Sequence, residues 1–427
     1  MNALYYIFLL THFGVTASLV LDVEGGGGSL QGGSLIMQIL QGGSGFYALY
    51  VINGSATARA LLKKSWPMFL LVAVAAASAV WSVDPYLTIR RSTNLAISFL
   101  LAIALVGRIG AARAIHLVIR VMLTACVMSV IAVIVAPTLA VHQATDEFQN
   151  VHAGLWRGLL AHKVSLGMFS GLTLALLLFY GARCCGNPLL WVIGILGAAS
   201  CLIGSNSATG IVTMMLVGGL LCLSSFLKSC SQRFRQGLVK TINVGLLVLA
   251  YLIFTGNLDR FATLLGRSAD LTGRATYWPH VEAFINAYGY YLGFGYGAGF
   301  RIVGPLIKET AGMHLTEAHN GILELIVGLG HIGMTFVMGM YAWFVWRASQ
   351  IVSVVHWNST KATFFPYAVL SSLFIISYAE SIILSFNGVW AVLFALSLAV
   401  LHAQEMEFEE SEQSVEEEDE EETYVAL

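Results

Sequence analysis

Charged residues are scarce in this chain of 427 residues: Asp, Glu, Lys and Arg make up 11% of it, whereas hydrophobic residues make up 57%. Soluble domains carry about 25% charged residues, so most of this protein cannot face water. None of its six cysteines forms a CxxC pair, which gives no indication of a zinc site or a disulfide framework. The glycine run at 25–34 lacks the Lys-Ser/Thr pair of a phosphate-binding loop. The sequence also shows no internal duplication of the kind found in many transporters.

Long apolar runs, by contrast, recur along the whole chain. A helix that crosses a bilayer needs about 20 residues, and the sequence offers twelve such runs. They lie near residues 3–20, 35–53, 66–81, 92–107, 115–138, 164–181, 188–204, 207–227, 238–256, 318–346, 365–384 and 388–403. The first run lacks a basic n-region and a convincing cleavage site, so we interpret it as a retained helix. The sequence therefore predicts an all-α polytopic integral membrane protein with about twelve transmembrane helices.

Charge marks off the end of the chain. Residues 405–422 hold 12 of the 24 acidic residues, which leaves a body with 22 Lys and Arg against 12 Asp and Glu. A segment this charged is typical of a solvated, disordered extension. The predicted organisation is nine transmembrane helices over 1–256, a large outer loop over 257–317, three transmembrane helices over 318–403 and a disordered acidic cytoplasmic tail over 404–427.

Several cations fall on the side of the membrane where cations are rare. With a cytoplasmic N-terminus, every inside loop carries at least one Lys or Arg, as the positive-inside rule requires. The outer side nevertheless contains Arg90, Arg91, Arg157, Lys163, Arg260, Arg267, Arg274, Arg301 and Lys308. These residues indicate that an anion is held there, and contact with lipid phosphates is the alternative for each of them. Glu324 and Glu380 lie inside apolar runs, where either a polar cavity or an interhelical pair would explain them.

The outer segment 257–317 is the longest stretch of the body without an apolar run, and loops of this length are usually functional. Its residues Tyr277, Val281, Phe284, Ile285 and Tyr288 recur at helical spacing. They predict an amphipathic helix that lies on the membrane surface.

An arginine within the outer segment and a histidine just after it are candidates for chemistry. Arg274 precedes the predicted surface helix and His319 precedes the next apolar run, so we expect both at the same outer level of the membrane. A neutral histidine can accept a proton near pH 7, and an arginine can bind a phosphate with two donors. The pair suits attack by a hydroxyl on a phosphate-bearing substrate. Glu317 either orients His319 or favours the next helix as an acid near its N-terminus, and Asn320 suits a cap of that helix.

Three motifs in this region, "LTGRATYW", "LGFGYGAGF" and "EAHNGILELIVGLGHIG", resemble the signature of the O-antigen ligase and Wzy polymerase family, particularly ExoQ-type exopolysaccharide polymerases. Supporting matches are "WSVDPYLTIRRS" at 81–92, "WRGLLAHKVSLG" at 156–167, "GSNSATG" at 204–210 and "YAESIILSFNGVW" at 378–390. The resemblance thus covers residues 81–390. Together the motifs are specific for the family but not for one activity within it.

The resemblance implies a GT-C-type glycosyltransferase in the bacterial inner membrane, with its active site on the periplasmic face. Such an enzyme moves a saccharide from undecaprenyl diphosphate to a hydroxyl of an acceptor glycan, with inversion and without a metal or other cofactor. Polymerisation of exopolysaccharide or O-antigen is the expected activity. O-antigen ligase and protein O-oligosaccharyltransferase are alternatives within the enzyme class, and a permease without chemistry is the alternative outside it.

The expected partners follow from the same resemblance. They are the undecaprenyl-diphosphate-linked saccharide donor, the acceptor glycan, membrane lipids, and a chain-length regulator or other polysaccharide-assembly proteins. Nucleic acid is not expected among them.

The resemblance also implies roles for individual residues. His319 corresponds to the proposed general base of the family, and Arg274 to the loop arginine that contacts the donor diphosphate. Arg157 and Lys163 match a basic outer motif that binds the diphosphate, in which Val164 replaces a common asparagine.

One departure from the family pattern bears on the activity. Ala208 stands in the region where ligase-type members carry an arginine, which argues against a ligase. The second phosphate-binding residue therefore stays open, with Arg157, Arg90 and Arg91 as the alternatives. Glu317 and Asn320 complete the set of candidate substrate contacts, and no residue is predicted to bind a metal.

Overall fold

The computed structural model describes residues 2–15, 35–146, 150–160, 162–254, 274–312, 315–354, 361–386 and 388–425. Helices account for nearly all regular structure in these ranges. They contain no β-strand, and the only pairing of that kind is an isolated bridge between Val141 and Trp156. The predicted all-α fold is therefore confirmed for the described part of the chain.

The α-helices have the following bounds: α1 Asn2–His12, α3 Leu35–Asn53, α4 Ala56–Lys64, α5 Trp66–Ala77, α6 Pro85–Ile109, α7 Ala111–Val135, α8 Pro137–Ala140, α9 Lys163–Tyr180, α10 Pro188–Ser205, α11 Ala208–Leu227, α12 Gln232–Phe254, α14 Arg274–Tyr288, α15 Phe300–Ala311, α16 Gly321–Val354, α17 Phe365–Ile376 and α18 Gly388–Val425. Short 3₁₀ turns are η1 Ser78–Val80, η2 Asn150–His152, η3 Ala182–Cys184 and η4 Lys361–Phe364.

Side-chain caps fix where several of these helices begin. The Asp84 carboxylate accepts from the amide of Leu87 at 3.0 Å, and Pro85 follows as the first residue of α6. The Asn187 side chain accepts from the amide of Leu189 at 2.8 Å at the start of α10. A polar cap followed by proline is a strong helix-start signal, because the first amides of a helix lack intrahelical acceptors.

The described helices make this a multi-pass membrane protein. By length and composition, seven of them can cross a membrane, or eight if the bent pair α4 and α5 forms one broken span. All twelve predicted apolar runs contain a helix, although α1, α3, α12 and α17 do not pass the same test. The predicted number of about twelve spans is therefore not confirmed, while the positions of the helices agree with the sequence.

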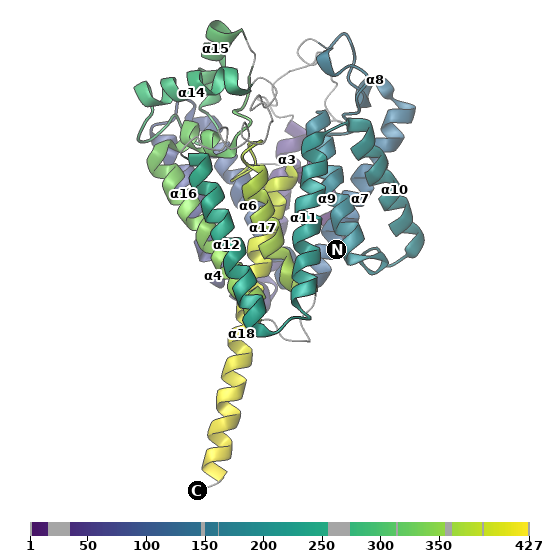
Figure 1. The fold of residues 1–427 in the computed structure, drawn as a ribbon, viewed down its shortest axis with the longest axis vertical. Coiled ribbons are helices and arrows are strands. Elements are labelled where there is room, and N and C mark those ends of the chain that lie inside the picture. The colour runs from purple at the N-terminus through teal and green to yellow at the C-terminus, as the bar shows by residue number, and fades with distance from the viewer. Residues whose placement is uncertain are drawn as a thin grey trace.

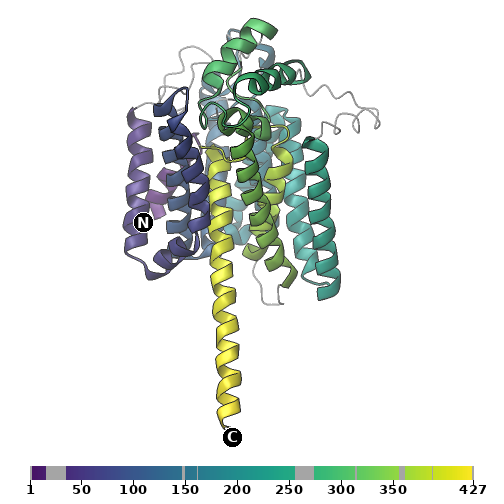
Figure 2. The same ribbon diagram turned by 90° about the vertical axis from the view of Figure 1, so that its left-hand side faces the viewer.

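The bundle has two distinct ends. In Figure 1, α14 and α15 lie at the top, beyond the ends of the long helices, and α18 leaves the bundle at the bottom. Figure 2 shows the same arrangement from the side, with α18 (yellow) projecting far beyond the other helices. We call these the site end and the tail end. The segment predicted as an outer loop and the acidic tail therefore lie at opposite ends of the molecule.

The helices α9 and α11 approach each other closely through glycines. A Cβ added to Gly171 would lie 2.2 Å from the carbonyl oxygen of Gly210, and one added to Gly167 would lie 2.3 Å from Ser207. Small residues allow such backbone approach between membrane helices. The packing joins "WRGLLAHKVSLG" to "GSNSATG", because Gly167 ends the first motif and Gly210 ends the second.

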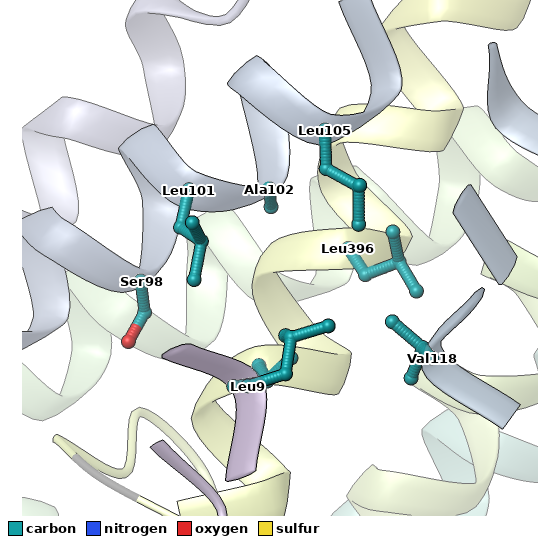
Figure 3. A pocket seen from close by; sticks show the side chains of 8 residues that line it. Leu9, Ser98, Leu101, Ala102, Leu105, Val118 and Leu396 are labelled. Atoms are coloured by element: carbon teal, nitrogen blue, oxygen red, sulfur yellow. The ribbon is translucent and has the colours of Figure 1, made fainter. Parts of the chain in front are cut away.

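A small void remains among α1, α6, α7 and α18 (Figure 3). Its volume is about 10 Å³, and its lining is apolar apart from Ser98, whose hydroxyl already donates to the carbonyl oxygen of Asn94 at 3.0 Å. A space of this size holds about one water molecule at most. It is a packing defect of the core and too small for a substrate.

The amphipathic helix exists, but its apolar face does not lie on the membrane. Tyr277, Val281 and Ile285 of α14 are at most 3% exposed and pack with Val303 and Ile307 of α15 in a separate hydrophobic cluster. The apolar pattern did not predict α15, whose Val303 and Ile307 side chains pack into this cluster. The prediction of a surface-lying helix is therefore wrong in its contacts, since lipid cannot reach buried side chains.

The tail also differs from the prediction. Instead of being disordered from residue 404, the chain continues α18 as a helix to Val425. The helix is already nucleated by its apolar part, so that each added residue needs no new nucleus, and Glu has good helix propensity. Glu405 also pairs with Arg347 at 2.6 Å, and Glu409 pairs with Lys64, which holds the first part of the tail against the bundle.

The penultimate apolar run, 365–384, is not one helix. The helix α17 ends at Ile376, and residues 377–386 continue as an irregular loop that is buried at Ile382, Ile383 and Leu384. Leu384 has a left-handed φ of 53°. Irregular backbone at membrane depth is tolerated where protein surrounds it. This loop, which we call the 377–386 loop, contributes directly to the site.

Candidate active site

His319 lies in the short loop that leads into α16 at the site end. Its neighbour Ala318 is held on both sides: its amide donates to the Glu324 carboxylate at 2.9 Å, and its carbonyl oxygen accepts from the Tyr277 hydroxyl at 3.1 Å and the Trp278 indole at 3.0 Å. The imidazole of His319 is about one-third exposed. The loop is therefore fixed while the ring stays accessible.

The backbone of His319 adopts a left-handed conformation, with φ at 47°. Residues other than glycine rarely adopt this conformation, although histidine is among those that do so more often. Such geometry persists where surrounding contacts determine it, and it clusters at functional sites. Here the contacts of Ala318 hold the chain just before His319, and the capped start of α16 holds it just after.

The following residues anchor the loop to α16 and to the 377–386 loop. The Asn320 side chain accepts from the amides of Ile322 at 3.0 Å and Leu323 at 3.1 Å, so Asn320 caps the helix as predicted. The Gly321 amide donates to the carbonyl oxygen of Ser377 at 2.7 Å. A Cβ at residue 321 would lie 1.9 Å from the Ser377 hydroxyl, so a larger residue would require this hydroxyl to rotate away.

Two carboxylates flank the imidazole. The Nδ1 atom of His319 lies 3.4 Å from Oε2 of Glu380 and 3.4 Å from Oε1 of Glu317. Glu380, in the 377–386 loop, is 7% exposed, whereas the Glu317 side chain is 43% exposed. With the proton on Nδ1, the ring donates toward these acids and its Nε2 lone pair becomes the basic site. Carboxylates so placed also stabilise the imidazolium that forms on protonation.

The basic motif at 156–167 reaches the same end of the bundle. His162 caps α9, its Nδ1 accepting from the Val164 amide at 3.2 Å, and Lys163 is the first residue of the helix. Burial, together with the neighbouring His142, His152 and His319, lowers the pKa of His162 to about 3. His162 therefore lies within electrostatic range of His319, and Lys163 follows it in the chain.

Arg157 of the same motif has an internal role. Its Nε donates to the carbonyl oxygen of Leu139 at 2.9 Å, Nη1 to the carboxylate of Asp146 at 3.3 Å and Nη2 to the carbonyl oxygen of Thr138 at 3.1 Å. Arg157 is 7% exposed. Each of its three nitrogens already has a protein acceptor, so Arg157 links residues 138–146 to the basic motif.

The arginines of α6 and α15 form a second group of basic side chains. Arg91 is half-buried and lies within electrostatic range of Arg90, Arg301 and Glu324. Arg301 pairs with Asp84 at 3.4 Å. Glu324 is in turn within range of His319, so this cationic group and the imidazole share one neighbourhood.

Arg274 is placed only in part. It is the first residue of α14, so its backbone lies at the site end as predicted. Its side chain lies outside the described residues, as do the predicted outer cations Arg260 and Arg267.

The three groups at His319 also have the spacing of a metal site. One ligand atom each from Glu317, His319 and Glu380 lies within 4.8 Å of the others. Two carboxylates and one imidazole can bind a divalent cation. Both carboxylates face the same nitrogen, Nδ1, in an ion-pair arrangement, and a metal at that position would require the opposite tautomer of the ring. The arrangement therefore favours a proton on Nδ1.

Among the described residues, the structure joins His319 with Glu317 and Asn320, which the sequence had placed together. It adds Glu380, whose role the sequence had left open between a cavity and a structural pair. The signal for Glu380 was its position as an acid inside an apolar run; its partner could not be read from spacing, because 61 residues separate the two.

A family comparison addresses the same region. Residues 192–338 match the family model described as O-antigen ligase. This match supports membership of the O-antigen ligase family for that region. The matched part runs from α10 into α16 and includes Arg274 and His319, whereas Arg91, Lys163 and Glu380 lie outside it. A match to this family supports a glycosyl-transfer role in polysaccharide assembly. No curated protein matches the chain.

Proposed function

We propose that this protein is an inverting glycosyltransferase that polymerises saccharide units carried on undecaprenyl diphosphate. It would act at the periplasmic face of the bacterial inner membrane and transfer the growing glycan to a hydroxyl of the acceptor unit. One observation carries the proposal: an accessible imidazole, held between two carboxylates, lies at the site end inside the family-matched region. Such a group suits removal of a proton from an attacking hydroxyl.

The reaction is a single displacement. The acceptor oxygen attacks the anomeric carbon while His319 Nε2 takes its proton, and the new glycosidic bond forms on the opposite face of the sugar. The bond from the anomeric carbon to the donor phosphate breaks, and its electron pair goes to the phosphate oxygen. Glu380 holds the ring through Nδ1 and stabilises the imidazolium, which is the part that a carboxylate plays in a catalytic triad.

Cations of three helices suit the leaving diphosphate. Lys163 begins α9 next to His162, Arg90 and Arg91 belong to α6, and Arg274 begins α14. The diphosphate gains negative charge as the glycosidic bond breaks, so positioned cations stabilise the transition state more than the ground state. Binding two lipid-linked substrates next to each other supplies a further share of the rate.

Polymerase is preferred over ligase because of Ala208. It is the first residue of α11, exposed, and preceded by the cap residue Ser207, so no cation stands where ligase-type members are expected to carry one. O-antigen ligase remains the second candidate, since the family model bears that description. The two activities differ in their acceptor. Offering a lipid A core acceptor in place of a second lipid-linked unit would distinguish them.

The test uses purified full-length protein in detergent with lipid-linked oligosaccharide, and chain growth is followed by gel electrophoresis. His319→Ala should lower turnover by about 10²–10⁴-fold, the usual contribution of base catalysis. His280→Ala, at an exposed histidine of α14, is the matched control and should keep full activity. Wild-type protein that binds the donor but forms no product would support a permease and reject the proposal.

A second arm separates base catalysis from metal catalysis. Wild-type protein treated with EDTA and passed into metal-free buffer should keep its turnover. Loss of turnover that Mn²⁺ or Mg²⁺ restores would assign Glu317, His319 and Glu380 to a metal and reject His319 as the base.

A further inference from the structure

A partly open recess of about 490 Å³ lies where α7, α9, η3 and η4 meet. Its walls are mainly apolar, and its polar groups belong to His116, Tyr180, Arg183 and Lys361. Volumes of about 300–1,000 Å³ are typical of sites for small molecules. The recess is therefore large enough for a ligand, unlike the void in the core, and no step of the proposed reaction uses it.

The recess lies at the end of the bundle opposite to His319. The helix α9 begins with Lys163 near the His319 end, and its 18 residues end at Tyr180 on the wall of the recess. A helix of this length spans about 27 Å, close to the roughly 30 Å of the hydrocarbon core of a bilayer. Because α9 is one of the candidate membrane spans, the recess lies at the level of the lipid headgroups at the tail end.

The charged residues around the recess have one sign. Each of the three segments that line it supplies an arginine or a lysine and contains no Asp or Glu: residues 112–116, 180–183 and 361–362. In addition, α7 begins at Ala111 without a side-chain cap, and the first amides of a helix carry partial positive charge. The positive-inside rule explains cations at this level but not their position around an apolar recess. Together, the charges favour an anion.

The lysine is held in place while the arginine lies at the rim. The Lys361 ammonium donates to the carbonyl oxygen of Phe179 and lies 4.7 Å from the centroid of the Phe179 ring. The Tyr180 hydroxyl donates to the carbonyl oxygen of Lys361 at 3.3 Å. An ammonium has three N–H donors, and the bond to Phe179 uses one of them. Arg183 is exposed, so its guanidinium can reach a ligand in the recess.

The acidic tail contacts the recess without supplying a carboxylate there. The Gln404 side chain of α18 donates to the carbonyl oxygen of Ala362 at 3.0 Å. The next residue, Glu405, pairs with Arg347 at 2.6 Å. The acid beside this contact is therefore already bound to another cation.

We propose that the recess binds an anionic phospholipid of the leaflet at the tail end, with its phosphate at Arg183 and Lys361 and part of an acyl chain on the apolar wall. Basic pockets between membrane helices on the cytoplasmic side bind anionic headgroups in this way. A soluble phosphate compound would match the cations but leave the apolar wall in water. The lipid would connect the start of α7, the end of α9 and η4. The inference does not depend on the proposed function, because the recess lies at the other end of the molecule.

The experiment measures lipid binding to purified full-length protein in detergent. Dioctanoyl phosphatidylglycerol is titrated, and the bound fraction is read by native mass spectrometry. Dioctanoyl phosphatidylcholine has the same chains and no net charge, so it should bind about 5-fold more weakly or worse, the share of one cation at a membrane surface. Glycerol 3-phosphate, which lacks the chains, should bind more weakly still. Equal affinity for the two lipids would overturn the proposal, and equal affinity for glycerol 3-phosphate would assign the recess to a soluble phosphate compound instead.

The charge of Arg183 is tested by substitution. Arg183→Gln should raise Kd for phosphatidylglycerol by about 5-fold, while Arg183→Lys should keep the wild-type value because it keeps the charge. Arg233→Gln, at an exposed arginine in the first turn of α12 at the same end, is the matched control for general attraction of anionic lipid and should bind as wild type does. Equal affinities of Arg183→Gln and Arg233→Gln would overturn the proposal.

The shape of the recess is tested separately. Ala112→Leu keeps every cation but fills part of the recess, and leucine suits a helix, so α7 should still form. Because the added side chain competes with the acyl chain for space, Kd should rise by about 5-fold or more. Wild-type affinity in this variant would show that the lipid binds elsewhere. If Ala112→Leu does not fold, Arg183→Gln, at an exposed position, decides the question alone.

Discussion

At the scale of single residues, Glu380 is the buried carboxylate beside Nδ1 of His319. Replacing it by glutamine keeps the size of the side chain but removes the charge beside Nδ1. We expect Glu380→Gln to lower turnover by about 10-fold or more, because the imidazolium formed during catalysis loses its stabilising partner. The acidic limb of the pH–rate profile should move to lower pH, since the ring then binds a proton less readily. Turnover measured between pH 5 and 9 checks both effects.

Glu317 provides the matched comparison. It lies at the same 3.4 Å from Nδ1 of His319 but is 43% exposed at its side chain, so water screens its charge. Glu317→Gln should therefore shift the pH–rate profile less than Glu380→Gln does. Equal shifts would show that burial of Glu380 has no influence on the base, and an unshifted profile in Glu380→Gln would remove it from the mechanism.

Individual residues also show where sequence reasoning succeeds. His319 and Asn320 stand before an apolar run, and that local order already predicts a residue at the membrane edge and a helix cap. Glu317 follows from the same order. Glu380 could not be assigned in this way, because its contact with His319 depends on a loop that the apolar sequence of 365–384 does not reveal.

A second prediction concerns the histidines between α8 and α9. The imidazoles of His142, His152 and His162 lie 5.4 to 5.7 Å apart between ring centroids. Burial lowers the pKa of all three, and that of His162 to about 3. The unfolded chain therefore binds more protons than the folded chain below about pH 6.5, so stability falls as the pH drops through that region toward 3.

His162→Asn should weaken this pH dependence. Asparagine keeps an acceptor for the Val164 amide at the helix cap but cannot take up a proton. Thermal unfolding of the detergent-solubilised protein between pH 5 and 8 should show a smaller loss of Tm on acidification for this variant than for wild type. His280→Asn, at an exposed position of α14, should leave the dependence unchanged. A wild-type slope in His162→Asn would contradict the prediction.

At the scale of elements, the break in α16 positions the glycine-rich segment before α15. Gly330 has a φ of 66°, and the amides of Phe294 and Gly295 donate to the carbonyl oxygens of Val327 and Gly328, at 2.9 and 2.8 Å. The break thus turns helix carbonyls toward the segment that contains Gly297. A Cβ at residue 330 would lie 2.2 Å from the carbonyl oxygen of Tyr291.

We therefore expect Gly330→Ala to lower Tm markedly and to reduce activity, because alanine neither fits the space nor favours that backbone conformation. Gly339→Ala on the same helix is the matched control. Nothing lies within 4 Å of a Cβ at residue 339, so this variant should keep the wild-type Tm or raise it slightly. If the two variants have the same Tm, the break is not the constraint that the packing indicates.

The helices also show what an apolar pattern can and cannot predict. Such a pattern locates helices well, and each predicted run holds one. It does not show where a run is interrupted, since the 377–386 loop contains no proline, and the glycine at 330 is one of several in α16. Interruption depends on contacts from distant segments, such as the bond between Gly321 and Ser377.

At the scale of the whole molecule, the two ends differ in their charged contacts. At the tail end, Arg347 and Lys64 are paired with Glu405 and Glu409 of α18. At the site end, the Arg91 guanidinium lies over the Phe386 ring, with Cζ 4.1 Å from the ring centroid. The acids concentrate in the tail segment, while cations occur on both predicted sides of the membrane. The proposed reaction requires the site end to lie on the far side of the membrane from the tail.

Cysteine labelling tests this orientation with little change to the protein. Among the six cysteines, Cys222 is exposed and Cys230 is half-buried, and the other four are buried, so replacing these two by serine removes the reactive background. Thr310→Cys then reports on the site end, and Gln232→Cys, at the start of α12, reports on the tail end.

We expect a membrane-impermeant maleimide to label Thr310→Cys in intact spheroplasts and Gln232→Cys only after permeabilisation. This pattern would place His319 and Arg91 outside the cytoplasm, where a flipped donor lipid presents its diphosphate. The reverse pattern would put the base on the cytoplasmic side, and the proposed reaction with a donor on the outer leaflet would then be impossible, whatever the activity of the His319 variant.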